Sequence, residues 1–72
     1  MQLDNAIRLI RENAERHSEK RPTFGTLMEE VAELTLALRG KHEHPPELEL
    51  VQIGGIVANM LCRYPDAGAV GE

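Results

Sequence analysis

Bulky aromatic residues are almost missing from this chain of 72 residues, which has no Trp, one Phe and one Tyr. A chain of this length forms one small domain, and such a domain buries only about 60% of its unfolded surface. Aliphatic side chains must therefore build the core. We expect a single helical domain over residues 1–72 whose core is completed by further copies of the chain, as a homodimer or homotetramer.

Cysteine, basic residues and long apolar runs are also scarce. Cys62 is the only cysteine, which excludes an intramolecular disulfide and fits a reducing, cytoplasmic setting. The 8 basic and 12 acidic residues give a net charge of −4, so a nucleic-acid polymer is not an expected partner. No apolar run approaches the roughly 18 residues of a membrane-spanning helix, and Arg8 and Arg11 interrupt any signal-peptide core.

Three segments show the periodicity of amphipathic helices, and no segment alternates as a strand does. The expected helices cover residues 2–17, 23–39 and 45–63. Thr23 is the expected N-cap of the second helix, with Thr26 as the alternative one turn later. The pattern predicts an all-α fold of three helices. The second and third helices should form a hairpin within a dimeric or tetrameric helical bundle.

Each expected helix has an apolar stripe for the core. The stripes are Leu3, Ile7, Ile10, Ala14 and His17, then Leu27, Val31, Leu34 and Leu38, then Leu50, Ile53, Ile56, Val57, Met60 and Leu61. Gly54 and Gly55 interrupt the third helix, and we attribute them to a close backbone contact with a neighbouring helix. Glu12 and Arg16 are expected to pair across one helical turn. Residues 66–72 lack periodicity and are expected to form a frayed tail.

Four polar residues lie in unusual positions relative to these stripes. Glu30 and Glu33 project along one flank of the second helix. Glu49 falls inside the apolar face of the third helix, where it must be paired, protonated or bound to a cation. If the two helices run antiparallel, these carboxylates meet Gln52, and together their oxygens suit Mg²⁺ or Mn²⁺. Alternatively, the glutamates are solvated, or Glu49 pairs with Arg63 or with an arginine of a partner subunit.

The segment from Phe24 to Leu34, followed by residues 49–52, resembles the MazG-like all-α nucleoside triphosphate pyrophosphohydrolases. That family carries Glu-x-x-Glu on one helix and Glu-x-x-Asp on the next. Here Glu30-x-x-Glu33 is followed, after fifteen residues, by Glu49-x-x-Gln52. The resemblance covers roughly residues 23–60, most of the chain.

This resemblance implies an enzyme that uses Mg²⁺ to cleave a nucleoside triphosphate into the monophosphate and pyrophosphate, often to remove non-standard nucleotides. The implied metal ligands and catalytic groups are Glu30, Glu33 and Glu49, with Gln52 as a further ligand and Glu29 as an ancillary carboxylate. Asn59 and Arg63 share the flank of Gln52, and we expect them to contact substrate. For Arg63, the alternative is a helix C-terminal cation favoured by the helix dipole.

Two features depart from the family pattern. Gln52 stands where the family usually has Asp, and an amide brings no charge and cannot act as a base. Family members commonly continue into another helix, which the tail after Pro65 is not expected to form. Either a partner subunit supplies the missing contacts or the activity is reduced. The alternative function is a non-catalytic helical oligomer that binds a nucleotide or a protein partner.

The loop before the third helix contains His42 and His44 on either side of Glu43. A His-x-His pair can bind a metal ion, but two histidines without further ligands are weak evidence for a site. We therefore expect these two histidines to be solvated, and His17 to lie at an interface or at the edge of the core.

Overall fold

The computed structural model describes residues 1–18 and 22–65. Within these residues the chain forms three α-helices, α1 (Leu3–Arg16), α2 (Phe24–Leu38) and α3 (Pro46–Leu61), and no strand. The all-α prediction is confirmed, and each helix is one or two residues shorter at its ends than the periodicity predicted. The predicted frayed tail, residues 66–72, lies outside the described residues. None of the three helices has the length and apolar character needed to cross a bilayer.

Both ends of α2 are fixed by local hydrogen bonds. Thr23 and Thr26 form a reciprocal capping box: Thr26 N donates to Thr23 Oγ1 at 3.2 Å, and Thr23 N donates to Thr26 Oγ1 at 3.4 Å. At the other end Gly40 adopts a φ of 69°, a conformation that favours glycine, and Lys41 N donates to Leu36 O at 2.9 Å. The predicted N-cap at Thr23 is thus confirmed, with Thr26 as its partner.

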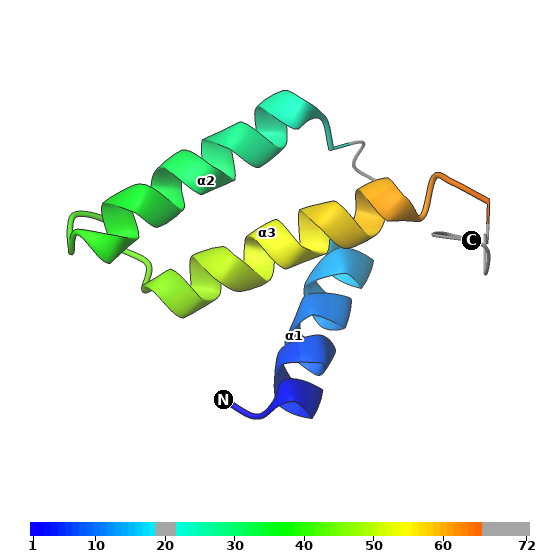
Figure 1. Cartoon of the computed structure of the whole chain (residues 1–72), viewed down its shortest axis with the longest axis horizontal. Coiled ribbons are helices and arrows are strands. Elements are labelled where there is room, and N and C mark those ends of the chain that lie inside the picture. The colour runs from blue at the N-terminus through cyan, green and yellow to red at the C-terminus, as the bar shows by residue number, and fades with distance from the viewer. Residues whose placement is uncertain (19–21, 66–72) are drawn as a thin grey trace, which may run out of the picture.

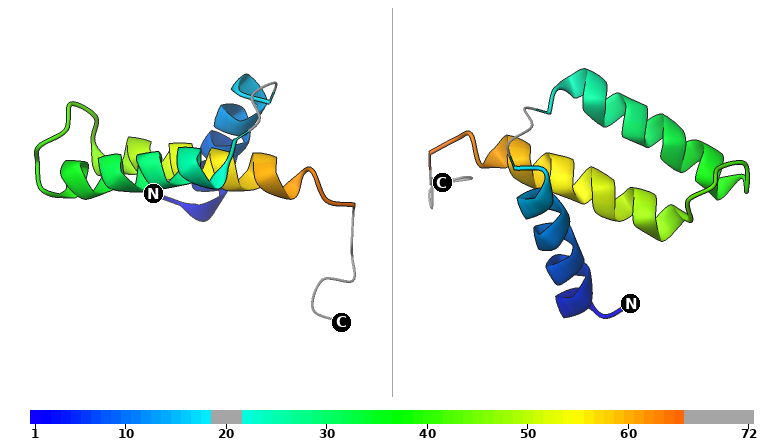
Figure 2. Two further views of the ribbon diagram at one scale, coloured as in Figure 1. Left: turned by 90° about the horizontal axis from the view of Figure 1, so that it is seen from above. Right: turned by 180° about the vertical axis from the view of Figure 1, so that it is seen from behind.

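Helix α3 lies between the other two helices. It contacts both α1 and α2, whereas no Cα atoms of α1 and α2 lie within 8 Å of each other. Figures 1 and 2 show α2 and α3 side by side and running in opposite directions, with α1 crossing α3 on its other side. Pro45 and Pro46 precede and open α3, where the missing N–H of a proline costs no helical hydrogen bond.

The crossing of α1 and α3 depends on Gly54 and Gly55. A Cβ atom on Gly54 would lie 2.8 Å from Ile10 Cγ1, and one on Gly55 would overlap the side chain of Asn13. Asn59 Nδ2 also donates to Ala14 O across this contact at 3.1 Å. The predicted close approach at the two glycines is confirmed, because neither position has room for a side chain.

Few apolar side chains are buried by the single chain. Ala37 is the only buried hydrophobic residue among those described. The prediction that Leu3 and Leu38 face the core is wrong, since they are 72% and 68% exposed. The polar Asn13 is buried instead. The predicted ion pair of Glu12 with Arg16 is replaced by one with Arg8, whose Nη1 lies 2.8 Å from Glu12 Oε1. Periodicity identifies the apolar side of a helix, but it does not say whether another helix covers it.

Candidate metal centre

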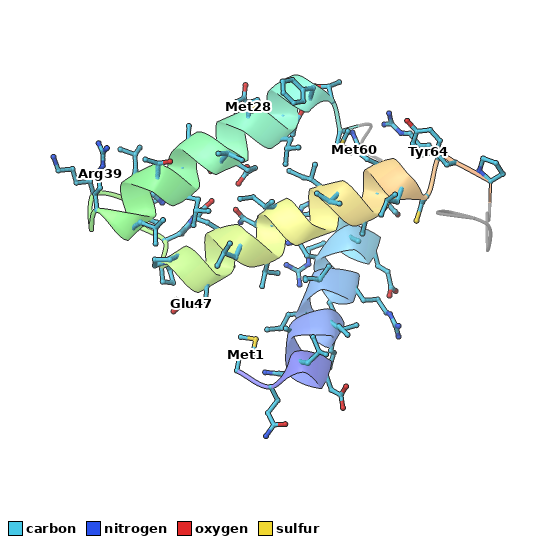
Figure 3. All side chains as sticks on the ribbon, in the orientation of Figure 1. Met1, Met28, Arg39, Glu47, Met60 and Tyr64 are labelled. Atoms are coloured by element: carbon cyan, nitrogen blue, oxygen red, sulfur yellow. The ribbon has the colours of Figure 1, made fainter. Side chains whose placement is uncertain are left out.

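The buried carboxylate of Glu49 is the centre of the site. Glu49 lies in the first turn of α3 and is 0% exposed, as expected from its position inside the apolar face. Side chains of α2 and α3 fill the space between the two helices, whereas Met28 and Glu47 project away from it (Figure 3). A charge buried in this way needs partners, because its desolvation costs several kcal/mol.

Two further carboxylates near Glu49 come from α2. Glu30, Glu33 and Glu49 each offer a carboxylate oxygen, and these three atoms lie within 4.8 Å of one another. Burial, together with the neighbouring charges of Glu33 and Glu49, raises the pKa of Glu30 from 4.5 to about 7. The structure therefore brings together the three glutamates that the sequence singled out. Their repulsion is relieved by a proton or by a cation.

Gln52 joins the two helices at this point. Its amide is assigned so that the nitrogen faces the carboxylates, and it then donates to Glu30 Oε2 at 2.9 Å and to Glu49 Oε2 at 3.1 Å, which satisfies all three side chains. In this arrangement Gln52 stabilises the carboxylates as a donor. With the opposite assignment the amide oxygen faces the same carboxylates, as a metal ligand would, and that role stays a prediction.

Two histidines that we expected to be solvated also meet Glu49. His44 Nδ1 lies 3.2 Å and His42 Nδ1 lies 3.6 Å from Glu49 Oε1. Both histidines are partly buried, and the backbone N–H of His44 donates to His42 Nδ1 at 3.1 Å. The expectation of a solvated side chain is wrong for His42, which is 16% exposed, whereas the side chain of His44 is 43% exposed and turns one ring nitrogen toward Glu49. The sequence held no signal for this contact, because it depends on the conformation of the loop.

A cleft of about 480 Å³ opens beside the carboxylates, within the usual size range of small-molecule sites of roughly 300–1,000 Å³. Residues of all three helices line it, among them Glu30, Gln52 and Asn59, as do His17 and Pro22. A wider depression of about 1010 Å³ lies between α1 and α3 and is lined by Arg63, but by none of the three glutamates. The smaller cleft is the better candidate for a ligand because it adjoins the charged groups.

The remaining predicted residues are not all brought to this cleft. Asn59 lines it, but its amide also holds α1 through Ala14 O. Glu29 is exposed on α2 and lies outside the group of converging carboxylates. Arg63 is exposed and lines the other depression, so the alternative in which it pairs with Glu49 is wrong; the side chains nearest Glu49 Oε1 are those of His42 and His44.

Comparisons of the chain with known protein families, with curated protein sequences and with solved structures found no significant match. The resemblance to the MazG-like family therefore stays a prediction from the motif. What the site can do follows from its geometry: three carboxylates from two helices converge, and one of them, that of Glu30, lines a cleft of about 480 Å³.

Proposed function

We propose that this chain is a Mg²⁺-dependent nucleoside triphosphate pyrophosphohydrolase of the MazG-like type, in which Mn²⁺ can replace Mg²⁺. One observation carries the proposal: carboxylate oxygens of Glu30, Glu33 and Glu49 lie within 4.8 Å of one another, and Glu30 also lines the cleft. Substrates would be ribo- or deoxyribonucleoside triphosphates, and the products would be the monophosphate and pyrophosphate.

The donor set fits a hard divalent cation. Oxygen ligands from carboxylates suit Mg²⁺ and Mn²⁺, and Mg²⁺ is commonly held by one or two carboxylates together with substrate phosphates. Bound Mg²⁺ supplies charge stabilisation to the phosphates and lowers the pKa of a coordinated water. Glu30, Glu33 and Glu49 would hold the ion, and the raised pKa of Glu30 reflects the crowding of charge that a cation relieves.

We propose that the α2–α3 hairpin assembles into a homodimer or homotetramer. The support is the apolar surface that the single chain leaves uncovered, including Phe24, Met28 and Leu38 on α2. A partner subunit would also supply phosphate contacts, because Arg63 does not line the cleft. Size-exclusion chromatography with light scattering should give a multiple of the 8.0 kDa chain mass. A stable folded monomer would refute the assembly.

Hydrolysis is tested by measuring pyrophosphate release from a panel of nucleoside triphosphates with Mg²⁺. Glu33→Gln and Glu49→Gln should each lower kcat/KM by about 100-fold or more, because each removes a charged ligand while keeping the side-chain shape. Glu47→Gln is the matched control, since Glu47 is exposed in the same helical turn as Glu49. If Glu33→Gln and Glu49→Gln are as active as the Glu47→Gln control, the assignment of the site is overturned.

The second candidate is a non-catalytic oligomer that binds a nucleotide or a protein partner. It is favoured by Gln52, whose amide donates to Glu30 and Glu49 and so compensates part of their charge without an ion. Thermal melts separate the two functions. Stabilisation by Mg²⁺ or Mn²⁺ supports the enzyme, whereas stabilisation by a nucleotide alone, with no metal effect, supports the binding protein.

A further inference from the structure

The histidine loop and Glu49 form a second group of potential ligands, separate from Glu30 and Glu33. His42, His44 and Glu49 each offer a nitrogen or oxygen atom, and these atoms lie within 4.8 Å of one another. The distances from Glu49 Oε1 to the two Nδ1 atoms are 3.2 and 3.6 Å. Ligand atoms about 2.1 Å from a tetrahedral Zn²⁺ ion are about 3.4 Å apart. The two distances from Glu49 Oε1 are therefore close to the spacing of ligand atoms around such an ion.

The hydrogen bonds around Glu49 Oε1 place His42 Nδ1 beside it as a second acceptor. His44 Nδ1 is hydrogen-bonded to Glu49 Oε1 at 3.2 Å. His42 Nδ1 accepts the backbone N–H of His44 at 3.1 Å, and an imidazole nitrogen that accepts in this way offers a lone pair. This nitrogen lies 3.6 Å from the oxygen of the fully buried carboxylate, so two atoms that can each donate a lone pair to a metal ion lie side by side.

We propose that His42, His44 and Glu49 bind a divalent transition-metal ion of the Zn²⁺ type. Imidazole nitrogen with carboxylate oxygen suits Zn²⁺, whereas Mg²⁺ prefers oxygen ligands alone. On binding, the lone pair of His42 Nδ1 turns from the backbone N–H to the ion, and His44 loses any proton from Nδ1.

This site does not depend on the proposed hydrolysis, although the two share Glu49. The two oxygens of that carboxylate face different groups: Oε1 faces the histidines, and Oε2 accepts from Gln52. The histidine site therefore uses the oxygen that Gln52 does not contact.

The test is calorimetric titration of Zn²⁺ into the full chain prepared without a polyhistidine tag. We expect one ion per chain, with an affinity that falls at least tenfold in His42→Ala and in His44→Ala. His17→Ala is the matched control, because it removes the third histidine and leaves the site intact. No Zn²⁺ binding by the wild type, or an equal loss of affinity in all three variants, would overturn the proposal.

Two further measurements distinguish a loss of Zn²⁺ binding from a folding defect, and binding at the histidines from binding at the carboxylates. Circular dichroism shows whether each variant is folded, and His42→Gln and His44→Gln replace any alanine variant that is not. The absorption of bound Co²⁺ in the visible range reports nitrogen ligation in a tetrahedral site. Glu30→Gln should keep Zn²⁺ binding, whereas loss of Zn²⁺ binding in Glu30→Gln would show that the ion sits among the carboxylates instead. If the chain binds Zn²⁺ as described but hydrolyses no nucleotide, the histidine site is supported and only the proposed hydrolysis fails.

Discussion

Replacing Gln52 by Asp tests how the site balances charge. The wild-type amide donates to Glu30 Oε2 at 2.9 Å and to Glu49 Oε2 at 3.1 Å. Gln52→Asp removes both donors and adds a further negative charge beside carboxylates that already repel one another. Without metal, this variant should therefore be less stable than the wild type. With Mg²⁺ it should recover, because the new carboxylate is a charged ligand for the same ion.

The expected loss is large for a chain of this size. A hydrogen bond to a charged group contributes about 1.5–3 kcal/mol, so losing two removes at least about 3 kcal/mol before repulsion is counted. The whole free energy of unfolding of so small a domain is roughly 4–11 kcal/mol. At about 4–8 °C per kcal/mol, Tm should fall by about 12 °C or more.

Thermal melts followed by circular dichroism, in a chelator and then in excess Mg²⁺, measure both effects. Gln52→Leu is the matched control, because it removes the same two donors without adding charge. Both variants should melt early in chelator, and Mg²⁺ should raise the Tm of Gln52→Asp by more than that of Gln52→Leu, because only the aspartate adds a charged ligand to the three glutamates. The reasoning is refuted if Gln52→Asp is as stable as the wild type in chelator, or if Mg²⁺ shifts both variants equally.

Two further predictions concern Glu30 and the helix crossing. Since the pKa of Glu30 rises from 4.5 to about 7 on folding, the folded chain retains a proton that the unfolded chain loses between these pH values. The free energy of unfolding of the metal-free protein, measured in urea, should therefore fall as pH rises from 4.5 to about 7. If the free energy of unfolding of a Glu30→Gln variant falls equally steeply with pH, Glu30 is not the cause. Gly55→Ala should cost about 1–3 kcal/mol in urea unfolding, because its Cβ overlaps Asn13. Gly25→Ala is the control, because its Cβ meets only Thr23 Oγ1 at 3.5 Å and should not lower the free energy of unfolding. If both substitutions lower it equally, steric overlap is not the cause.

Much of the fold could be predicted because it is encoded locally. Thr23 and Gly40 mark the ends of α2 through capping hydrogen bonds and a positive φ, both of which depend on a few neighbouring residues. Gly54 and Gly55 indicated a close helix contact because their low helix propensity needs a compensating reason. Glu49 was predicted to be buried for a similar reason, since it lies within an apolar face.

What the sequence did not predict depends on long-range arrangement. Helical periodicity assigns Leu38 to an apolar side, but that side is covered only where another helix reaches it. Asn13 is polar, and it became buried because α1 crosses α3 at a glycine. The contact of His42 and His44 with Glu49 was missed because it depends on loop conformation, which has no periodic pattern.

Helix α1 approaches only α3 closely among the described helices, because no Cα atom of α1 lies within 8 Å of one in α2. The three converging carboxylates belong to α2 and α3, whereas one wall of the adjoining cleft, with Asn13, belongs to α1. Substitutions on α1 can therefore change the shape of the cleft without replacing any of these carboxylates.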